Sequence, residues 1–155
     1  MRKTLPIAAV AIASVLVVGY VAQARAPHGR QPTVIYVIEH ATTDTVIDIG
    51  PVGDSSGDLL TFANEVFDES NTEKVGRDQG DCVRINVTEG SWECRWILFV
   101  AGGALTVEGP FYDTKDSTLI ITGGRGIYAG AGGSMQLKLR DSLTEFDFIY
   151  KIILN

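Results

Sequence analysis

The chain has 155 residues, 45% of them hydrophobic and 21% charged, a composition that fits one compact domain. It carries 13 lysines and arginines against 19 aspartates and glutamates. The net charge of −6 argues against non-specific binding to nucleic acid, because such binding depends on neutralising phosphates. No regular repeat or biased run is present, which excludes collagen-like, coiled-coil and low-complexity chains.

The first 26 residues have the features of an export signal peptide. Arg2 and Lys3 supply a positive start, residues 5–22 are uncharged and mainly apolar, and Ala24-Arg25-Ala26 forms a small-x-small cleavage site. Cleavage after this site predicts a secreted or extracytoplasmic protein with no membrane attachment. The alternatives are an uncleaved membrane anchor and a cut two residues earlier.

Residues 27–32 have no apolar periodicity and are expected to form a flexible leader before a domain that spans residues 33–155. Period-two alternation of apolar and polar side chains dominates this domain and predicts half-buried strands. The alternation is clearest over residues 83–87, 135–139 and 146–154. Further strands are predicted over residues 34–39, 45–49, 58–67, 92–100, 105–108 and 118–122.

Short polar and glycine-rich turns separate the predicted strands. They fall at residues 50–51, 54–57, 69–71, 89–90, 102–103 and 123–124. About eight strands without helical crossovers predict antiparallel pairing, and in a chain of this length they fit an eight-stranded antiparallel β-barrel better than a sandwich. A barrel of this size holds either a packed core or one small ligand.

Two short motifs suggest chemistry that the rest of the chain does not support. Residues 53–57 match the Gly-x-Ser-x-Gly turn of serine hydrolases, but that site needs a helix and a later histidine, and both His28 and His40 come earlier. Residues 124–129 match a dinucleotide-binding pattern, but more glycines follow where a helix must begin. With two histidines and two cysteines twelve positions apart, no metal site is predicted.

Cys82 and Cys94 flank a predicted hairpin and have the same parity, so both side chains point to one face of the sheet. Because exported proteins occupy oxidising compartments, we predict a cross-strand disulfide between them. The alternative is a free Cys82 that lines a cavity, with Cys94 as core filler.

The same parity predicts one wall of the barrel interior. Its members are Trp92, Cys94, Trp96 and Leu98 on one strand, and Leu60, Phe62, Asn64 and Val66 on another. Asn64 and Glu39 are the informative polar residues, because an unsatisfied polar group inside a barrel costs roughly 1–3 kcal/mol. If both point inward, a functional role is favoured over a purely structural one.

Several sequence blocks resemble, in order and spacing, the allene oxide cyclase family. They are residues 57–64 (GDLLTFAN), 74–76 (KVG), 80–83 (GDCV), 107–111 (VEGPF) and 121–128 (ITGGRGIY). The resemblance extends over residues 34–154, and residues 123–133 are also similar to a glycine-rich segment of the dirigent proteins, which share this barrel. It implies a barrel that is commonly a homotrimer, with a mostly apolar cavity and no cofactor. Plant members of the family cyclise an unsaturated fatty-acid epoxide, chiefly by holding it in one conformation.

The resemblance also implies roles for individual residues. Asn64 matches an asparagine that helps to hold a water on the epoxide oxygen, and Glu39 matches a glutamate that stabilises developing positive charge. The implied ligand contacts are Leu60, Phe62, Cys82, Trp92 in place of a phenylalanine and Phe111 in place of a tyrosine. Ala41 and Ile47-Asp48 stand where the plant cyclases have further partners of that water, which argues against the plant reaction itself.

We therefore expect an exported barrel that binds an apolar, oxygenated small molecule and steers its cyclisation or isomerisation without a cofactor. In this interpretation Asn64 is a hydrogen-bond donor and Glu39 an electrostatic stabiliser or base. The first alternative is a non-catalytic, dirigent-like or carrier barrel for hydrophobic or phenolic ligands. The second is a purely structural barrel with a filled core.

Overall fold

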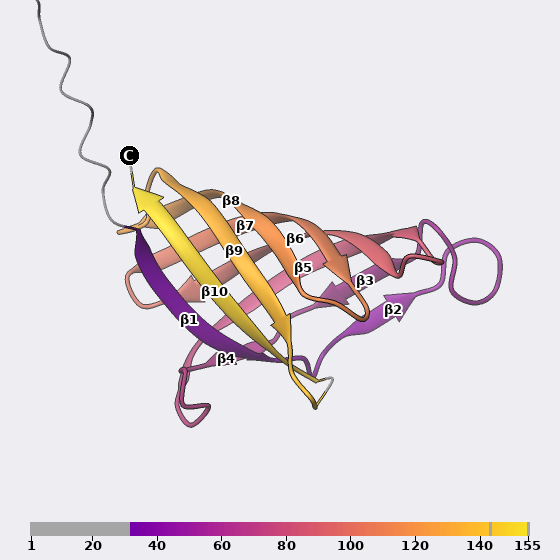
Figure 1. The fold of residues 1–155 in the computed structure, drawn as a ribbon, viewed down its shortest axis with the longest axis horizontal. Coiled ribbons are helices and arrows are strands. Elements are labelled where there is room, and N and C mark those ends of the chain that lie inside the picture. The colour runs from indigo at the N-terminus through magenta and orange to yellow at the C-terminus, as the bar shows by residue number, and fades with distance from the viewer. Residues whose placement is uncertain (1–31, 143, 155) are drawn as a thin grey trace, which may run out of the picture.

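A computed structural model describes residues 32–142 and 144–154, and strands are the only regular elements among them (Figure 1). The strands are β1 (Thr33–His40), β2 (Thr45–Ile47), β3 (Leu59–Phe62), β4 (Glu65–Phe67), β5 (Lys74–Asn86), β6 (Ser91–Val100), β7 (Gly103–Tyr112), β8 (Ser117–Gly126), β9 (Ala131–Leu139) and β10 (Glu145–Leu154). Within this part of the chain no helix long and apolar enough to cross a membrane is found. The expected signal peptide, and all but the last residue of the expected leader, lie outside the described residues.

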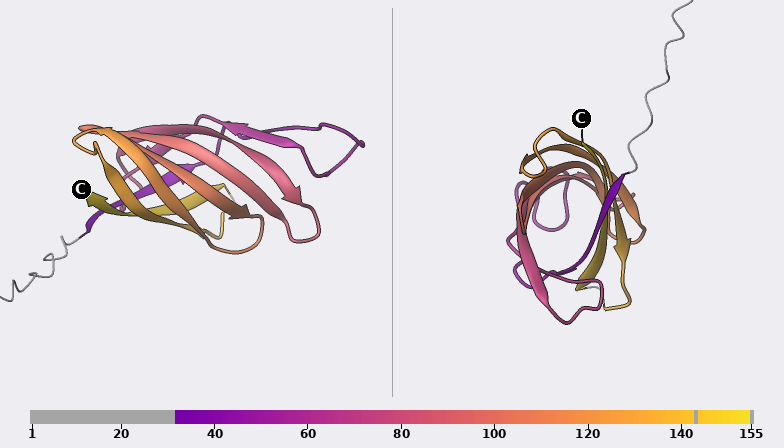
Figure 2. Two further views of the ribbon diagram at one scale, coloured as in Figure 1. Left: turned by 90° about the horizontal axis from the view of Figure 1, so that it is seen from above. Right: turned by 90° about the vertical axis from the view of Figure 1, so that its left-hand side faces the viewer.

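The ten strands form a closed antiparallel barrel of eight strands, as predicted (Figure 2, right). β1 and β2 are two halves of one barrel strand, and β3 and β4 are two halves of its neighbour, because β1 pairs with β4 and β2 with β3. β5 pairs with both halves of that neighbour and with β6. The meander from β6 to β10 then returns to β1, and this last pairing closes the ring.

Both interrupted strands break at the same level of the barrel. Between the pairs His40–Glu65 and Thr45–Thr61, four residues on the first strand oppose three on the second. One extra residue on one strand is the definition of a β-bulge, which bends the strand and re-aims nearby side chains. Residues 41–44 form this bulge, and Asn64 lies directly opposite it.

Alternate side chains fill the interior, as the period-two pattern predicts. On β6 the side chains of Trp92, Cys94, Trp96 and Leu98 are at most 4% exposed. On β10 the buried positions are Phe148, Tyr150 and Ile152. The predicted wall on β6 is therefore confirmed.

The prediction for β5 was wrong in extent, whereas the inward side of Cys82 is confirmed. The strand begins at Lys74, well before the alternating segment that starts at Val83, because its first half carries glycines and charged residues instead of an apolar alternation. Arg84 is buried, whereas Ile85 is 55% exposed, so the inner face is the one that holds Cys82 and Arg84. The buried Arg84 is tolerated because carboxylates surround it, as described below.

The expected turn at residues 123–124 is also wrong, because β8 continues to Gly126. A Cβ at Gly124 would lie 2.5 Å from the carbonyl oxygen of Tyr128, so the chain passes too closely there for a side chain. The glycines of this segment permit close backbone approach within a strand, and the reversal itself falls at residues 127–130.

Candidate functional site

The barrel encloses a cavity of about 40 Å³ between β1, β3, β5, β6, β7, β9 and β10. Most of its wall is apolar and consists of Leu60, Phe62, Trp96, Phe111, Leu137, Phe146 and Phe148, together with the two cysteines. This volume admits water but is far below the roughly 300–1,000 Å³ of typical small-molecule sites. Leu60, Phe62, Phe111 and Phe146 are only half-buried, so the part of the wall that they form is next to solvent.

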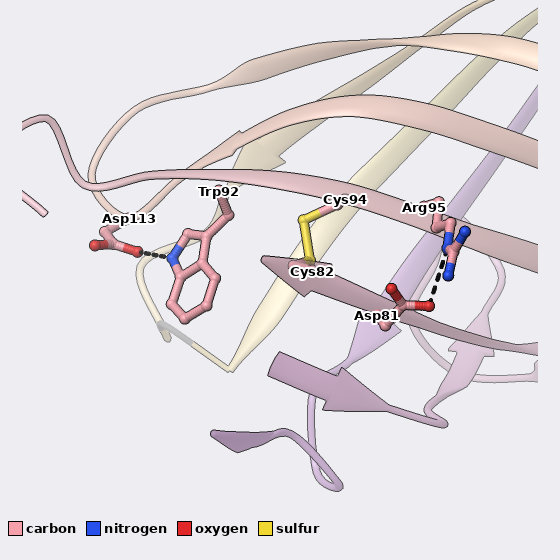
Figure 3. Close-up of a disulfide and its surroundings, with 6 residues drawn as sticks. All are labelled: Asp81, Cys82, Trp92, Cys94, Arg95 and Asp113. Carbon is pink, nitrogen blue, oxygen red and sulfur yellow. Dashed lines mark hydrogen bonds and ion pairs between the residues drawn. A yellow bond between two sulfur atoms is a disulfide. The ribbon is translucent and has the colours of Figure 1, made fainter. Parts of the chain in front are cut away.

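The predicted disulfide is present, and it forms part of the cavity wall. Cys82 on β5 is directly opposite Cys94 on β6, and the two are bonded (Figure 3). Their sulfurs face inward, while the neighbouring pair Asp81 and Arg95 forms an ion pair on the outer face. The alternative prediction, a free Cys82 thiol, is therefore wrong, because Cys82 is bonded to Cys94.

Trp92 does not join the other predicted ligand contacts in the cavity. Its Nε1 donates a hydrogen bond of 2.8 Å to Asp113 Oδ1 (Figure 3). The Arg84 guanidinium lies 4.0 Å from its ring centroid. Arg84 in turn donates to Asp54 and Asp113. Trp92 and Arg84 thus form a separate, internally satisfied cluster beside the loop that precedes β3.

The polar end of the cavity is built around Glu39 and Asn64, which are 5% and 1% exposed. Asn64 Nδ2 donates to Glu39 Oε1 at 2.9 Å and to Asp44 Oδ1 at 2.8 Å. Glu39 and Asp44 are the charged groups that line the cavity. The two residues expected to carry function do lie together, and Asp44 joins them from the bulge.

Asn64 also holds the bulge in place. Its Oδ1 accepts hydrogen bonds from the backbone N–H of Thr42, the backbone N–H of Thr43 and the Thr43 hydroxyl, at 3.1, 3.0 and 2.8 Å. The backbone N–H of Ala63 donates to the same hydroxyl. These contacts replace the ladder hydrogen bonds that the bulge interrupts. Both amide protons of Asn64 are used within the protein, so donation to a ligand would require one of them to leave its carboxylate.

A third acidic side chain, Asp78, lies behind Glu39. Asp78 points inward from β5, is 0% exposed, and neither of its carboxyl oxygens has a hydrogen-bond partner among the described residues. Burial raises the pKa of Asp78 to about 7. Burial also raises the pKa of Glu39 well above its usual value, and the neighbouring charge of Asp78 raises it further.

Tyr150 and Trp96 complete the polar core around these carboxyls. Trp96 Nε1 donates to the Tyr150 hydroxyl at 3.2 Å, and Tyr150 is 0% exposed. Burial raises the pKa of Tyr150, and the nearby Asp78 and Glu39 act in the same direction, so this hydroxyl stays protonated. Within the described residues, no group of three or more His, Cys, Asp and Glu side chains is arranged to hold a metal ion.

Sequence reasoning missed Asp44, Asp78 and Tyr150 as site residues. Asp78 could have been predicted as an interior residue from its parity with Cys82, because Asp78 and Cys82 both point inward from β5. Tyr150 was placed on an alternating strand but gave no sign of a polar neighbour. Asp44 could not be found, because its position depends on the bulge.

These features define a class: closed eight-stranded antiparallel barrels with a mostly apolar interior and a few acidic groups at one end of the cavity. The model of the family described as allene oxide cyclase matches residues 31–155. The chain belongs to the allene oxide cyclase family, which confirms the resemblance seen in its sequence blocks.

Solved structures of similar fold have diverse described activities. A pyocyanin demethylase superposes with a TM-score of 0.68 and 20% identity, over 78% of this chain and 100% of that chain. A pterocarpan synthase dirigent protein gives 0.63 and 17%, over 77% and 87%. A Diels–Alderase from Streptomyces koyangensis gives 0.59 and 14%, over 80% and 70%. At these identities the likeness concerns the fold alone.

Proposed function

We propose that this barrel binds an apolar, oxygenated small molecule with one end against Glu39 and steers its cyclisation or isomerisation. The observation that carries the proposal is the contrast within one cavity: an aromatic and aliphatic wall with Glu39 and Asp44 at one end. Such a wall restricts the conformations of a bound chain or ring system, which reduces the entropy lost on reaching the transition state. A buried acidic group at the end of that wall can exchange a proton with the ligand.

Ligand identification is the first experiment. Protein purified from its native source would be analysed by native mass spectrometry, and any bound small molecule would be released and identified. Turnover of that compound class would then be compared for the wild type, Glu39→Gln and Glu93→Gln. Glu93 is an exposed glutamate on β6 and serves as the control.

The expected result is a loss of turnover of about 100-fold or more in Glu39→Gln, the size of a general acid–base contribution, and no change in Glu93→Gln. Equal turnover in all three proteins would overturn the proposed role of Glu39.

The second candidate is a carrier barrel that binds hydrophobic or phenolic ligands without changing them. The engagement of both Asn64 protons by Glu39 and Asp44 favours this candidate, because the predicted donor is already used. A ligand recovered chemically unchanged, with no turnover, would support it. A protein that carries no ligand and binds no apolar probe would instead support a filled, structural barrel.

We also propose that residues 1–26 direct export and are removed. The proposal rests on the charged start, the apolar stretch and the small residues of that segment. Sequencing the N-terminus of protein from culture medium and from cell fractions tests it. A start at Pro27 is the expected result, and an intact Met1 in the membrane fraction would indicate an anchor.

A further inference from the structure

Asp78 is an unusual group for a barrel interior. It is 0% exposed, and neither carboxyl oxygen has a hydrogen-bond partner among the described residues. An ionised carboxylate in such a place loses its hydration, and the nearby backbone N–H groups and the Glu39 carboxyl, none of them in full hydrogen-bond geometry, offset only part of that loss, so a charge there is unfavourable. The residues around Asp78 must therefore either compensate its negative charge or keep its carboxyl group protonated.

The surroundings of Asp78 offer no cation among the described residues. Glu39 on β1, Asp44 in the bulge and Tyr150 on β10 are the titratable groups that act on it or are acted on by it. On β6 its register partner is Leu98, with Trp96 beside it. Arg84 is the buried cation of the described residues, but it is six positions further along β5, about 20 Å away, and already bound to Asp54 and Asp113.

Asn64 connects Asp78 to Glu39. The backbone N–H of Asp78 donates to the backbone carbonyl of Asn64 at 2.9 Å, and the Asn64 side chain donates to Glu39 at 2.9 Å. The two acidic residues are thus held by the same asparagine, which lies on the barrel strand between β1 and β5. The Glu39 and Asp78 carboxyls lie within side-chain contact range of each other, and two carboxyl groups this close in an apolar interior do not both ionise, because each negative charge opposes the other.

We propose that Glu39 and Asp78 share one proton at neutral pH and work as a single acid–base group, in which Glu39 faces the cavity and Asp78 is the positioning residue behind it. The directions of both pKa shifts agree with this geometry, since burial is their main cause and the charge of Asp78 adds to the effect on Glu39. Such a pair titrates as a unit in two steps.

The role of the pair in chemistry rests on the proposed function, whereas the shared proton does not. In an isomerisation, Glu39 would take a proton from one position of the ligand and return it at another, so that the pair ends in its starting state and no co-reactant is needed. The acidic end also sets a ligand class. It disfavours a carboxylate and accepts a neutral group such as a carbonyl or hydroxyl.

The test uses the ligand-free protein with ¹³C-labelled side-chain carboxyls of Asp and Glu. NMR chemical shifts would be followed from pH 3 to 10 in the wild type, Asp78→Asn, Glu39→Gln and Asp81→Asn. Asp81 lies on the same strand but on the outer face, where it pairs with Arg95, and is the matched control. The signals of Glu39 and Asp78 are assigned by their loss in the respective variants.

We expect both signals to show two titration steps in the wild type and in Asp81→Asn. In Asp78→Asn, Glu39 should titrate in one step, at a pH lower by one unit or more. In Glu39→Gln, Asp78 should likewise show a single step, which keeps the test available if one variant does not fold. Independent single steps in the wild type, or an unchanged Glu39 curve in Asp78→Asn, would overturn the shared proton. A failure to find turnover would instead affect only the proposed function.

Discussion

At the scale of single residues, Asn64 has two tasks that are normally assigned to different side chains. Its oxygen supplies the acceptor that the bulged backbone needs, and its nitrogen supplies the donors that two carboxylates need. An asparagine can do this because its amide presents acceptor and donors in opposite directions. The residue that resemblance identifies as functional is thus also a structural one.

Replacing Asn64 with alanine should lower the free energy of unfolding by about 3 kcal/mol, because several donors and the buried Glu39 lose their partner at once. Urea unfolding measures this loss. Asn86→Ala is the control, since Asn86 is exposed and accepts one bond from the backbone N–H of Glu89. Its effect should stay within about 1 kcal/mol, and an equal effect of the two substitutions would contradict the role of Asn64 at the bulge.

Asp78 makes stability depend on pH in an unusual direction. Its pKa is about 7 in the folded protein against an ordinary value of 3.8, so the folded state binds more protons than the unfolded state between these values. The contribution of this group to stability is therefore fully present below pH 4, falls as the pH rises from about 4 to about 7, and is constant above that.

Asp78→Asn should consequently be stabilising relative to the wild type at pH 8, and less so at pH 4, with a difference between the two on the order of 1–3 kcal/mol. Denaturation at a series of pH values checks this. Comparing variant with wild type removes the effects of carboxylates such as Asp68, whose pKa is lowered to about 2 by backbone and side-chain hydrogen bonds. A difference that stays constant with pH would contradict the prediction.

At the scale of elements, the interruption shared by two neighbouring strands creates the polar site. An uninterrupted pair would place ladder hydrogen bonds where Thr42, Thr43 and Asn64 now meet, and Asp44 would have no reason to approach the cavity. β5 contributes from the other side through Asp78 and Cys82, which are four positions apart on its inner face.

The disulfide between β5 and β6 links two strands that a short turn already joins. Closing a loop of this length predicts a stabilisation of about 3 kcal/mol from restriction of the unfolded chain. A Cys82→Ala/Cys94→Ala double variant should lose about 2–3 kcal/mol in urea unfolding. Addition of a reductant should destabilise the wild type by a similar amount and leave the double variant unchanged. An equal effect of the reductant on both proteins would show that it does not act by reducing this disulfide, and would contradict the prediction.

Much of the barrel could be predicted because β6, β9 and β10 each contain a clear alternation of apolar and polar residues, over residues 92–96, 135–139 and 145–148. β5 could not be read in the same way, since its inner face holds Asp78, Gly80 and Arg84, whose burial depends on partners far away in sequence. For the site, the proximity of Glu39 and Asn64 followed from parity and resemblance. The contacts of Asn64 did not, because they depend on one extra residue in a strand register.

At the scale of the whole molecule, the small cavity is the feature that most limits function. A ligand larger than water can enter only if side chains at the half-buried part of the wall move. Phe146 is such a side chain, and its ring packs edge-on against Phe111 at 6.0 Å between centroids.

Phe146→Ala should therefore open the cavity and strengthen binding of an uncharged fluorescent probe such as N-phenyl-1-naphthylamine by about tenfold, at a cost of about 1–3 kcal/mol in stability. Fluorescence titration measures the affinity. Phe99→Ala is the control, because Phe99 is also half-buried but packs under Arg77, away from the cavity. Tighter probe binding in both variants would point to general loosening of the barrel.

The pairing of β1 with β10 joins the first and last strands of the described chain along eight consecutive residues. During synthesis, one edge of β1 stays without its neighbour until the end of the chain has emerged, and the ring cannot close earlier. A chain that stops before Glu145 leaves β1 and β9 as two open sheet edges with unpaired backbone groups. Such edges recruit strands from other molecules, so truncated copies of this protein should aggregate during production.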